Sequence, residues 1–145
     1  MSESVRYFED IEVGEVIETP ARTITEADVR AFAAISGDHG ALDRSRGAPG
    51  VPPTVPEILV PMFTSGFGLR VPTPQPQVLA FMVFDWRSIA PVRVGDTLRC
   101  RISVMAKRAM KDGGVLVEKR EMINQRDEVV QEAEYKLMVA RRPRG

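Results

Sequence analysis

The chain has few of the side chains that build covalent or metal-linked sites. Among its 145 residues there is one cysteine, Cys100, and one histidine, His39. A single cysteine excludes an internal disulfide, and one cysteine with one histidine cannot complete a zinc site of the usual kind. A glycine-rich phosphate loop and a nucleophile elbow are also missing. We therefore predict no metal and no cofactor, and a reducing cytoplasm suits the single cysteine.

The chain also lacks an excess of charge of either sign and lacks a long apolar run. Twenty lysines and arginines balance 20 acidic residues, so no electrostatic feature favours nucleic acid or an anionic membrane as a partner. No apolar stretch approaches the roughly 18 residues that a membrane span needs, and the opening MSESVRYFED is not a basic-then-apolar leader. We predict a soluble, cytoplasmic protein with no nucleic-acid partner and no membrane partner.

A single domain over residues 1–145 is expected, because this length is near the commonest domain size. In its first half, Thr25 and Asp28 form a capping pattern, and apolar residues then recur at helical intervals until Gly37. This predicts a short amphipathic helix over residues 25–35, which Gly37 ends.

A second helix is predicted within TVPEILVPMFTSGF. Thr54 and Glu57 form another capping pattern, with Pro56 in the first turn. After Glu57 the helix has almost no polar face, which predicts that it is buried on all sides. Pro61 lies inside it and removes a backbone donor, which predicts a kink.

The second half of the chain is predicted to form four antiparallel strands. Between Leu98 and Ala106, apolar and polar residues alternate, which is typical of a sheet with one dry and one wet face and puts Cys100 on the dry face. The predicted strands begin at residues 78, 98, 115 and 129, with turns between them. An apolar helix followed by such strands predicts an α+β fold in which the sheet wraps around a buried central helix.

Four segments spread along the chain form a joint pattern that is more specific than any one of them: YFEDIEVGEV, TITEAD, SGD and PVRVGDTL. With this pattern the whole chain resembles the MaoC-like, (R)-specific enoyl-CoA hydratase and dehydratase family. The resemblance implies the hot-dog fold, a long antiparallel sheet wrapped around a central helix.

The family's catalytic signature reads approximately SGDxNPLH, and residues 36–43 correspond to it as SGDHGALD. The resemblance implies that an aspartate and a histidine activate water for addition to an enoyl thioester. Here Asp38 is kept, but Gly40, Ala41 and Asp43 replace the asparagine, the proline and the catalytic histidine. Aspartate and imidazole have ordinary pKa values of about 3.9 and 6.5, so an aspartate does not share protons near neutrality as a histidine does.

A second family motif, His-Gly-Met at the front of the central helix, is also altered. Counting back without gaps from Ser65 and Gly66, which resemble the family's Ser-Gly, aligns Pro56 and Glu57 with its His and Gly. Another gap placement aligns Pro53-Thr54 there instead. In both cases the backbone amides at the helix start remain available to hold a thioester oxygen. The resemblance makes four residues candidates for substrate binding: Gly40, Thr54, Ser65 and Gly66.

Asp38 and His39 each have a second interpretation. Asp38 follows a helix-ending Ser-Gly, where an aspartate commonly closes a turn, while the resemblance favours a catalytic acid or base. His39 is at the family's variable position and is expected to face solvent. Its place beside the lost histidine also makes it a candidate substitute base.

Asp43 and Glu57 are the remaining catalytic candidates. Asp43 is either a second acid or a surface partner of Arg44 or Arg46, and Glu57 is either a capping residue or a pocket carboxylate. If Asp38, Asp43 and Glu57 share a pocket, repulsion between like charges would keep one of them protonated as a donor at neutral pH.

Three functions stay open. The first is a MaoC-like hydratase or dehydratase acting on 2-enoyl or 3-hydroxyacyl thioesters, as acyl-CoA or acyl-carrier protein, with a modified active site. The second is a non-catalytic subunit of a heteromeric hot-dog hydratase, and the third is a cyclase or thioesterase on the same scaffold. The resemblance also implies a homodimer, or a heterodimer with a related hot-dog subunit. The residues Phe81, Phe84 and Trp86 lie at both parities of the first strand, which favours core and dimer packing.

Overall fold

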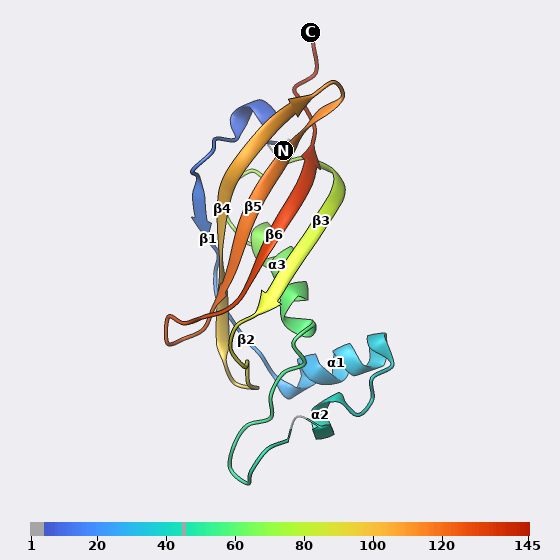
Figure 1. Ribbon diagram of the computed structural model, residues 1–145, viewed down its shortest axis with the longest axis vertical. Helices are drawn as coiled ribbons and strands as arrows, with labels where there is room; N and C mark the ends of the chain where they lie inside the picture. The colour runs from blue at the N-terminus through green and yellow to red at the C-terminus, as the bar shows by residue number, and fades with distance from the viewer. Residues whose placement is uncertain (1–4, 45) are drawn as a thin grey trace.

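The computed structural model describes residues 5–44 and 46–145, without the side chains of Leu42 and Arg44, and its centre is an antiparallel sheet (Figure 1). Along the sheet the strands lie in the order β1, β4, β5, β6 and β3, and β2 pairs with β4 off this path. Four long strands therefore form the body, with β3 at one edge. The strand bounds are β1 Val16–Glu18, β2 Arg22–Thr23, β3 Val78–Ser88, β4 Thr97–Met110, β5 Gly113–Ile123 and β6 Val129–Val139.

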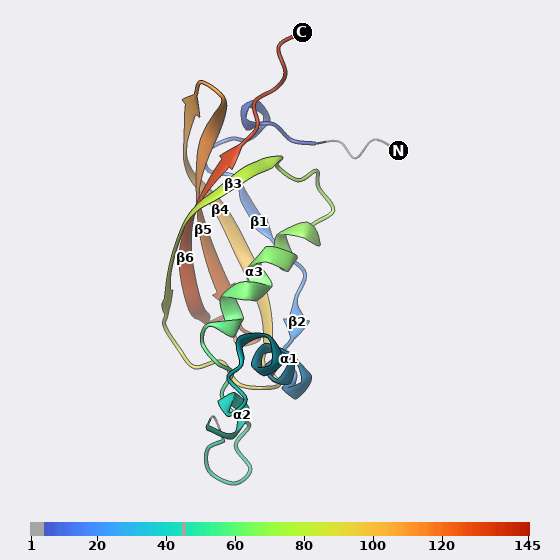
Figure 2. The same ribbon diagram turned by 90° about the vertical axis from the view of Figure 1, so that its right-hand side faces the viewer.

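Helix α3 (Leu59–Leu69) lies across the inner, concave face of the sheet, which curves around it (Figure 2). The predicted α+β arrangement of a sheet around a central helix is confirmed. The helix is not buried on all sides, however. One flank packs on the sheet, while Ile58, Met62, Ser65 and Leu69, spaced at helical intervals, are exposed. We call these four residues the exposed stripe.

The start of α3 differs from the prediction. Thr54 pairs with Arg93 in an isolated β-bridge, and the Val55 N–H donates to the Val92 carbonyl at 2.7 Å. The helix therefore begins only at Leu59, and its N-cap makes no side-chain hydrogen bond, so the predicted capping by Thr54 and Glu57 is wrong. Pro61 is then the third residue of the helix, where an amide has no intrahelical partner, and the reason for a kink disappears.

The first predicted helix is confirmed as α1 (Glu26–Ser36). Both hydrogen bonds of the Thr25–Asp28 capping box form, and Gly37 ends the helix in the left-handed conformation. A single short turn, α2 (Ala41–Arg44), follows. None of the helices in the described ranges is long and apolar enough to cross a membrane.

The edge strand β3 contains two irregularities, one between Val78 and Ala80 and one between Phe81 and Val83. Each bulge shifts the alternation of side chains by one position. Phe81 and Phe84 therefore both pack edge-on against Tyr135, on the inner face. In the sequence Phe81 and Phe84 are at opposite parities of the strand, but the bulge between Phe81 and Val83 brings both to the same face.

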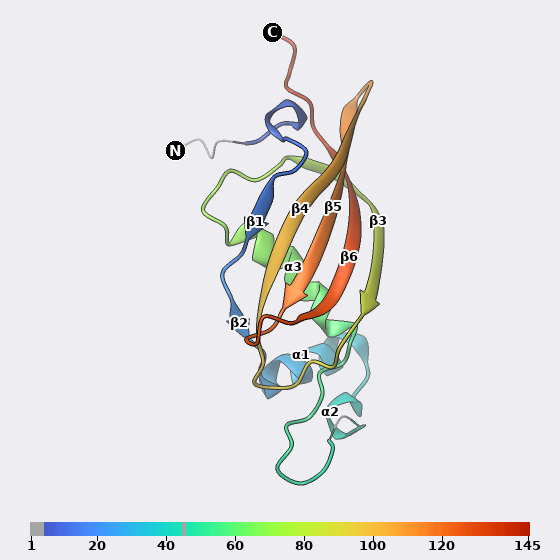
Figure 3. The ribbon, with the colours of Figure 1, turned by 60° about the vertical axis from the view of Figure 1, so that its left-hand side comes forward.

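The N-terminal segment closes the opposite end of the molecule from α1 and α2 (Figure 3). We call residues 5–15, which include the 3₁₀ turn η1 (Phe8–Asp10), the N-terminal strap. Phe8 lies flat on Gly114, where an added Cβ would come within 2.1 Å of the ring. Lys107 Nζ donates to the carbonyls of Phe8 (3.3 Å) and Ile11 (2.6 Å), so the strap is fixed to the sheet by packing and by hydrogen bonds.

Candidate active site

Asp38 lies in the turn that follows α1. Gly37 has φ 79°, a conformation that side chains rarely adopt, so the chain can turn sharply here. The Asp38 N–H donates to Ser36 Oγ at 3.2 Å, and the Ala41 N–H donates to the Asp38 carbonyl at 3.2 Å. Asp38 is thus half-buried in a hydrogen-bonded turn, at the same end of the molecule as the start of α3 (Figure 3).

Two candidate catalytic side chains after Asp38, those of His39 and Asp43, lie on the surface. His39 is exposed and Gly40 is half-buried. The Asp43 side chain is 82% exposed, and its Oδ1 lies 3.6 Å from Arg46 Nε, which confirms the predicted surface pairing with Arg46. The alternative partner, Arg44, lies outside the described side chains. The structure therefore holds Asp43 on the surface and not in a pocket.

Glu57 is also exposed, in the turn before α3. Its backbone carbonyl accepts a hydrogen bond from Gln131 Nε2 at 2.9 Å, which ties this turn to β6. Thr54 is half-buried, and its β-bridge to Arg93 holds it before the turn. Glu57 and Asp43 are both exposed, so neither carboxylate is desolvated, and their burial gives no support to the predicted pocket shared with Asp38.

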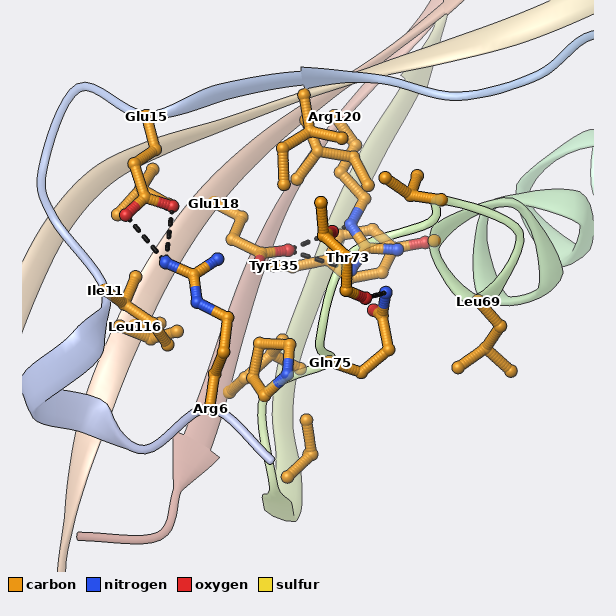
Figure 4. Close-up of a pocket in the computed structure, with 18 of the residues that line it drawn as sticks. Arg6, Ile11, Glu15, Leu69, Thr73, Gln75, Leu116, Glu118, Arg120 and Tyr135 are labelled. Carbon is orange, nitrogen blue, oxygen red and sulfur yellow. Dashed lines mark hydrogen bonds and ion pairs between the residues drawn. The ribbon is translucent and has the colours of Figure 1, made fainter. Parts of the chain in front are cut away.

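The main cavity lies beneath the C-terminal half of α3 (Figure 4). It has a volume of about 220 Å³, and it is bounded by the helix, the inner face of the sheet, the N-terminal strap and the loop at residues 71–76. Ser65 and Gly68 line it from the helix. Asp38, His39, Asp43 and Glu57 do not line it. Most of its wall is apolar, which suits an acyl chain.

A buried ion pair forms part of this wall. Arg120 donates from Nε (3.0 Å) and Nη2 (2.8 Å) to Oε2 of Glu118, and the two side chains are only 12% and 7% exposed. Arg120 Nη1 also donates to the Thr64 carbonyl at 3.0 Å, so the guanidinium joins β5 to the middle of α3. Arg120 lies between the main cavity and a space of about 10 Å³ under the first turn of α3, since it lines both.

Tyr135 completes this buried polar network. Its ring lies under the Arg120 guanidinium, 4.2 Å from ring centre to Cζ, a cation–π contact. Thr64 Oγ1 donates to the Pro61 carbonyl at 2.7 Å, so in its short hydrogen bond with Tyr135 the tyrosine hydroxyl is the donor. Burial raises the pKa of Tyr135. The hydroxyl therefore stays neutral and is already used within the protein.

A second ion pair faces the same cavity from the N-terminal strap. Arg6 Nη2 donates to both carboxylate oxygens of Glu15, at 2.7 and 2.9 Å, and to the Asp10 carbonyl at 2.8 Å. Burial tends to raise the pKa of Glu15, but hydrogen bonds from Arg6 and from the Glu12 N–H, together with nearby positive charge, outweigh it and lower the pKa. The cavity thus carries two neutralised charge pairs.

Comparison with known proteins agrees with this geometry. Residues 9–126 match the family model described as MaoC like domain. The chain belongs to the MaoC-like family. It is 34% identical over 146 residues to the beta-methylmalyl-CoA dehydratase of Chloroflexus aurantiacus, a match that covers 94% of this chain and 40% of that protein. It is 33% identical over 105 residues to the 3-hydroxybutyryl-CoA dehydratase of Methylorubrum extorquens, covering 69% of this chain and 64% of that protein.

Solved MaoC-like and hot-dog structures share the fold. An archaeal protein from Archaeoglobus, described as a monoamine oxidase regulatory protein, superposes with a TM-score of 0.84 at 30% identity, covering 96% of this chain and 97% of that one. The structure is therefore a hot-dog fold, as the sequence predicted. The chain spans between 31% and 64% of the lengths of three curated relatives.

Sequence reasoning missed the polar residues of the cavity in this MaoC-like chain. Glu118 and Arg120 share the inward parity of β5 with Leu116 and Met122, and a charged residue at an inward position was the signal that would have found them. Arg6 and Glu15 carried no such signal, because only the tertiary fold brings the strap to this wall. Among the residues that the structure describes, no group of three or more His, Cys, Asp or Glu side chains is placed to hold a metal.

The last part of the site is an open apolar face beside the cavity. Along β3, large apolar side chains are exposed on a strand whose outer edge has no neighbour in the described chain, with Phe81 57% exposed. Helix α3, which carries the exposed stripe, lies on the inner side of the same sheet (Figure 2). Exposed apolar faces of this kind mark interaction surfaces.

Proposed function

We propose that the protein is a hydratase or dehydratase of 2-enoyl or 3-hydroxyacyl thioesters, carried on CoA or on a carrier protein. One observation carries the proposal: Asp38 lies in a fixed turn at the end of the molecule where α3 starts, and that helix leads to an apolar cavity. The dehydratases and (R)-hydratases among the similar proteins support the reaction class.

In the proposed mechanism, the carboxylate of Asp38 takes a proton from water as the water oxygen adds to C3 of the enoyl group. The protonated Asp38 then delivers a proton to C2, so that one molecule of water is added across the double bond and the carboxylate is regenerated. The thioester oxygen gains negative charge on the way and is held by N–H groups of the first turn of α3, which have no intrahelical partners. Pro61 offers no N–H, and the Leu59 N–H already donates to the Pro56 carbonyl at 2.9 Å, so the proposed donors are the N–H groups of Ile58 and Val60.

The exposed stripe gives the acyl chain its proposed path. The space beneath α3 does not continue freely from the first turn to the cavity, because Arg120 lies between them. The stripe from Ile58 to Leu69 connects the two ends along the outside of the helix instead. An acyl chain lying there would be covered by a partner subunit.

That partner is proposed to be a second copy of this chain, paired through β3. An edge strand with exposed apolar side chains and unpaired backbone groups pairs readily with another strand, and the double hot-dog protein among the similar structures supports such pairing. Val83→Lys, on the outer strand, should convert the dimer to a monomer in sedimentation velocity at micromolar concentration. Val13→Lys, at an exposed site outside β3, should leave the dimer intact. A wild-type monomer would contradict the proposal.

A non-catalytic subunit is the second candidate. The observation that favours it is the position of Asp43, which replaces the family histidine and faces solvent beside Arg46. In that case the protein would contribute a wall and an interface to a related active subunit, and would not turn over substrate by itself.

Hydration of crotonyl-CoA, followed by loss of enoyl absorbance, separates these candidates. The wild type is compared with Asp38→Asn, with Asp43→His, and with Asp112→Asn in the β4–β5 turn as a matched control. A hydratase should lose at least about 100-fold in Asp38→Asn and keep its rate in Asp112→Asn. No wild-type activity with a gain in Asp43→His would favour the non-catalytic subunit, and full turnover by Asp38→Asn would remove Asp38 from the mechanism.

A further inference from the structure

Arg6 presents hydrogen-bond donors to the cavity. All three hydrogen bonds that its side chain donates to described residues come from one nitrogen, Nη2. Figure 4 shows the guanidinium between Glu15 and the side of the cavity where Glu118 and Tyr135 lie, with a second nitrogen directed away from Glu15. A guanidinium has five N–H donors in a fixed plane. Its unused edge is therefore available to a group inside the cavity.

Glu118 presents an acceptor to the same cavity. Both hydrogen bonds from Arg120 go to Oε2, so Oε1 is not engaged by that residue. In the described part of the chain, no fully buried side-chain nitrogen or oxygen lacks a hydrogen-bond partner. Because Glu118 lines the cavity, we conclude that Oε1 reaches the cavity surface.

The charge balance of the cavity decides which ligand group fits. Arg6 is neutralised by Glu15, and Arg120 by Glu118. A ligand carboxylate would add a net negative charge to a partly buried, already balanced site, and such a charge is costly to desolvate. A methyl end would leave the Arg6 donors and the Glu118 acceptor without partners when it displaces water from them. A neutral group that accepts a hydrogen bond from Arg6 and donates one to Glu118 gives both residues a partner.

The wall that carries Arg6 is fixed and not a loose tail. The Arg6 N–H donates to the Gln75 carbonyl at 3.1 Å, and the Gln77 N–H donates to the Arg6 carbonyl at 3.0 Å. With Phe8 packed on Gly114, these bonds hold the strap between the sheet and the loop after α3. The donors of Arg6 are thus positioned before any ligand enters, which lowers the entropic cost of binding.

We propose that this cavity selects acyl chains whose far end carries a neutral hydrogen-bonding group, of which a hydroxyl is the simplest. The Arg6 side chain donates a hydrogen bond to the oxygen of this group, and the Glu118 carboxylate accepts a hydrogen bond from it. The inference rests on the proposed function, since it assumes that the ligand is an acyl thioester. It makes Arg6 a specificity-determining residue. The volume of about 220 Å³ is enough for the far end of the chain only, since pockets that hold whole drug-sized ligands begin at roughly 300 Å³.

The test is equilibrium binding of saturated thioesters, which the hydratase reaction cannot consume. Octanoyl-, dodecanoyl- and hexadecanoyl-CoA are titrated calorimetrically to find the length that binds most tightly, because the path from Ile58 to Leu69 is about 16 Å long at about 1.5 Å per helical residue. At that length, three end groups are compared: methyl, hydroxyl and carboxylate. The hydroxyl form should bind about tenfold more tightly than the methyl form, as expected for one hydrogen bond to a charged group. The carboxylate form should bind no better than the methyl form.

Variants of Arg6 then test whether this residue causes the preference for the hydroxyl form. Arg6→Met should abolish the hydroxyl preference without weakening the methyl form. Arg6→Lys keeps the positive charge beside Glu15 but loses the planar fork, so its preference should fall part of the way. Arg141→Met is the matched control, because Arg141 also forms an ion pair with the strap, to Glu9, but does not line this cavity. It should keep the full preference.

Each other outcome counts against the proposal. Equal binding of the methyl and hydroxyl forms would overturn the selection, and tightest binding of the carboxylate form would replace it with selection for an anion. An unchanged hydroxyl preference in Arg6→Met would remove Arg6 from it. Failure of every thioester to bind would overturn both this inference and the proposed function, which distinguishes the two failures.

Discussion

The two ends of α3 differ in how their charged residues are held. At the N-terminal end, Asp38 is half-buried, His39 is exposed, and Asp43 pairs with Arg46 in the solvent. Toward the C-terminal end, Glu118 and Arg120 form an ion pair with little exposure, and Arg120 also donates to the Thr64 carbonyl in the middle of the helix. The recognisable motif lies where the protein is lightly packed. The tightly packed charges lie where the sequence shows no motif.

We infer from this difference that one end of the helix carries out the proposed reaction and the other end selects the acyl chain. A turn at the surface can present an acid to a thioester whose identity is set elsewhere, and loops commonly carry such groups on a rigid scaffold. The far end of the acyl chain is read by residues that the fold gathers from the strap, β5 and β6. If burial decides, charged residues at the two ends should contribute differently to the free energy of unfolding.

The largest expected effect comes from removing one partner of the buried ion pair, and it is compared with the same change in the surface ion pair. Arg120→Met leaves the Glu118 carboxylate buried without its partner and should lower the free energy of unfolding by about 3–5 kcal/mol. Arg46→Met leaves Asp43 in solvent and should change it by about 0–1 kcal/mol. Urea unfolding at fixed protein concentration measures both. Similar losses in the two variants would mean that the ends do not differ as their burial indicates.

Removing both partners of the buried pair should restore most of this loss. In the double variant Glu118→Leu with Arg120→Met, no charge is left unpaired, and the apolar side chains fill a similar volume. The free energy of unfolding is expected to return to within about 1–2 kcal/mol of the wild type. If the double variant is as unstable as Arg120→Met alone, the hydrogen bond from Arg120 to the Thr64 carbonyl matters more than the charge of Glu118.

How well the sequence predicted each element depended on where its hydrogen bonds go. Helix α1 was predicted closely, because Thr25 and Asp28 cap it within four residues of chain. The start of α3 was misplaced, because Thr54 and Val55 bond to residues near position 93, about 38 positions away in sequence, and not to the helix. The long strands followed from alternation, but the bulges in β3 are set by pairing and left no local signal.

The residues of the candidate site also differ in whether the sequence could predict them. Asp38 was proposed because it lies in a consecutive sequence motif, and the surface pairing of Asp43 with Arg46 was one of the two predicted interpretations of Asp43. The cavity was not found, because Arg6 and Tyr135 are 129 positions apart and meet only in the folded sheet. Short-range patterns locate turns and caps, while a wall built from both termini needs the structure.

The alkaline side of the stability curve tests the core under the first half of α3. Burial raises the pKa of Cys100 from 9.0 to about 12. The unfolded chain therefore loses this proton before the folded one, so stability is complete below pH 9 and falls as the pH rises toward 12, by about 1.4 kcal/mol per pH unit. The wild type should lose stability more steeply than Cys100→Ala between pH 9 and 10.5. Parallel curves would exclude this contribution.

The smallest expected effect lies on the acid side, at the cavity. The pKa of Glu15 is lowered in the folded protein, so its contribution is present above the ordinary value of 4.5 and is lost as the pH falls through the lower folded value. Glu15→Gln should show a shallower loss of stability than the wild type below pH 4.5, by less than about 1 kcal/mol, because the pair is partly exposed. Arg6→Met should follow Glu15→Gln, since it removes the guanidinium that stabilises the carboxylate. If Arg6→Met keeps the wild-type slope, the Glu12 N–H holds Glu15, and Arg6 faces the cavity without a strong partner.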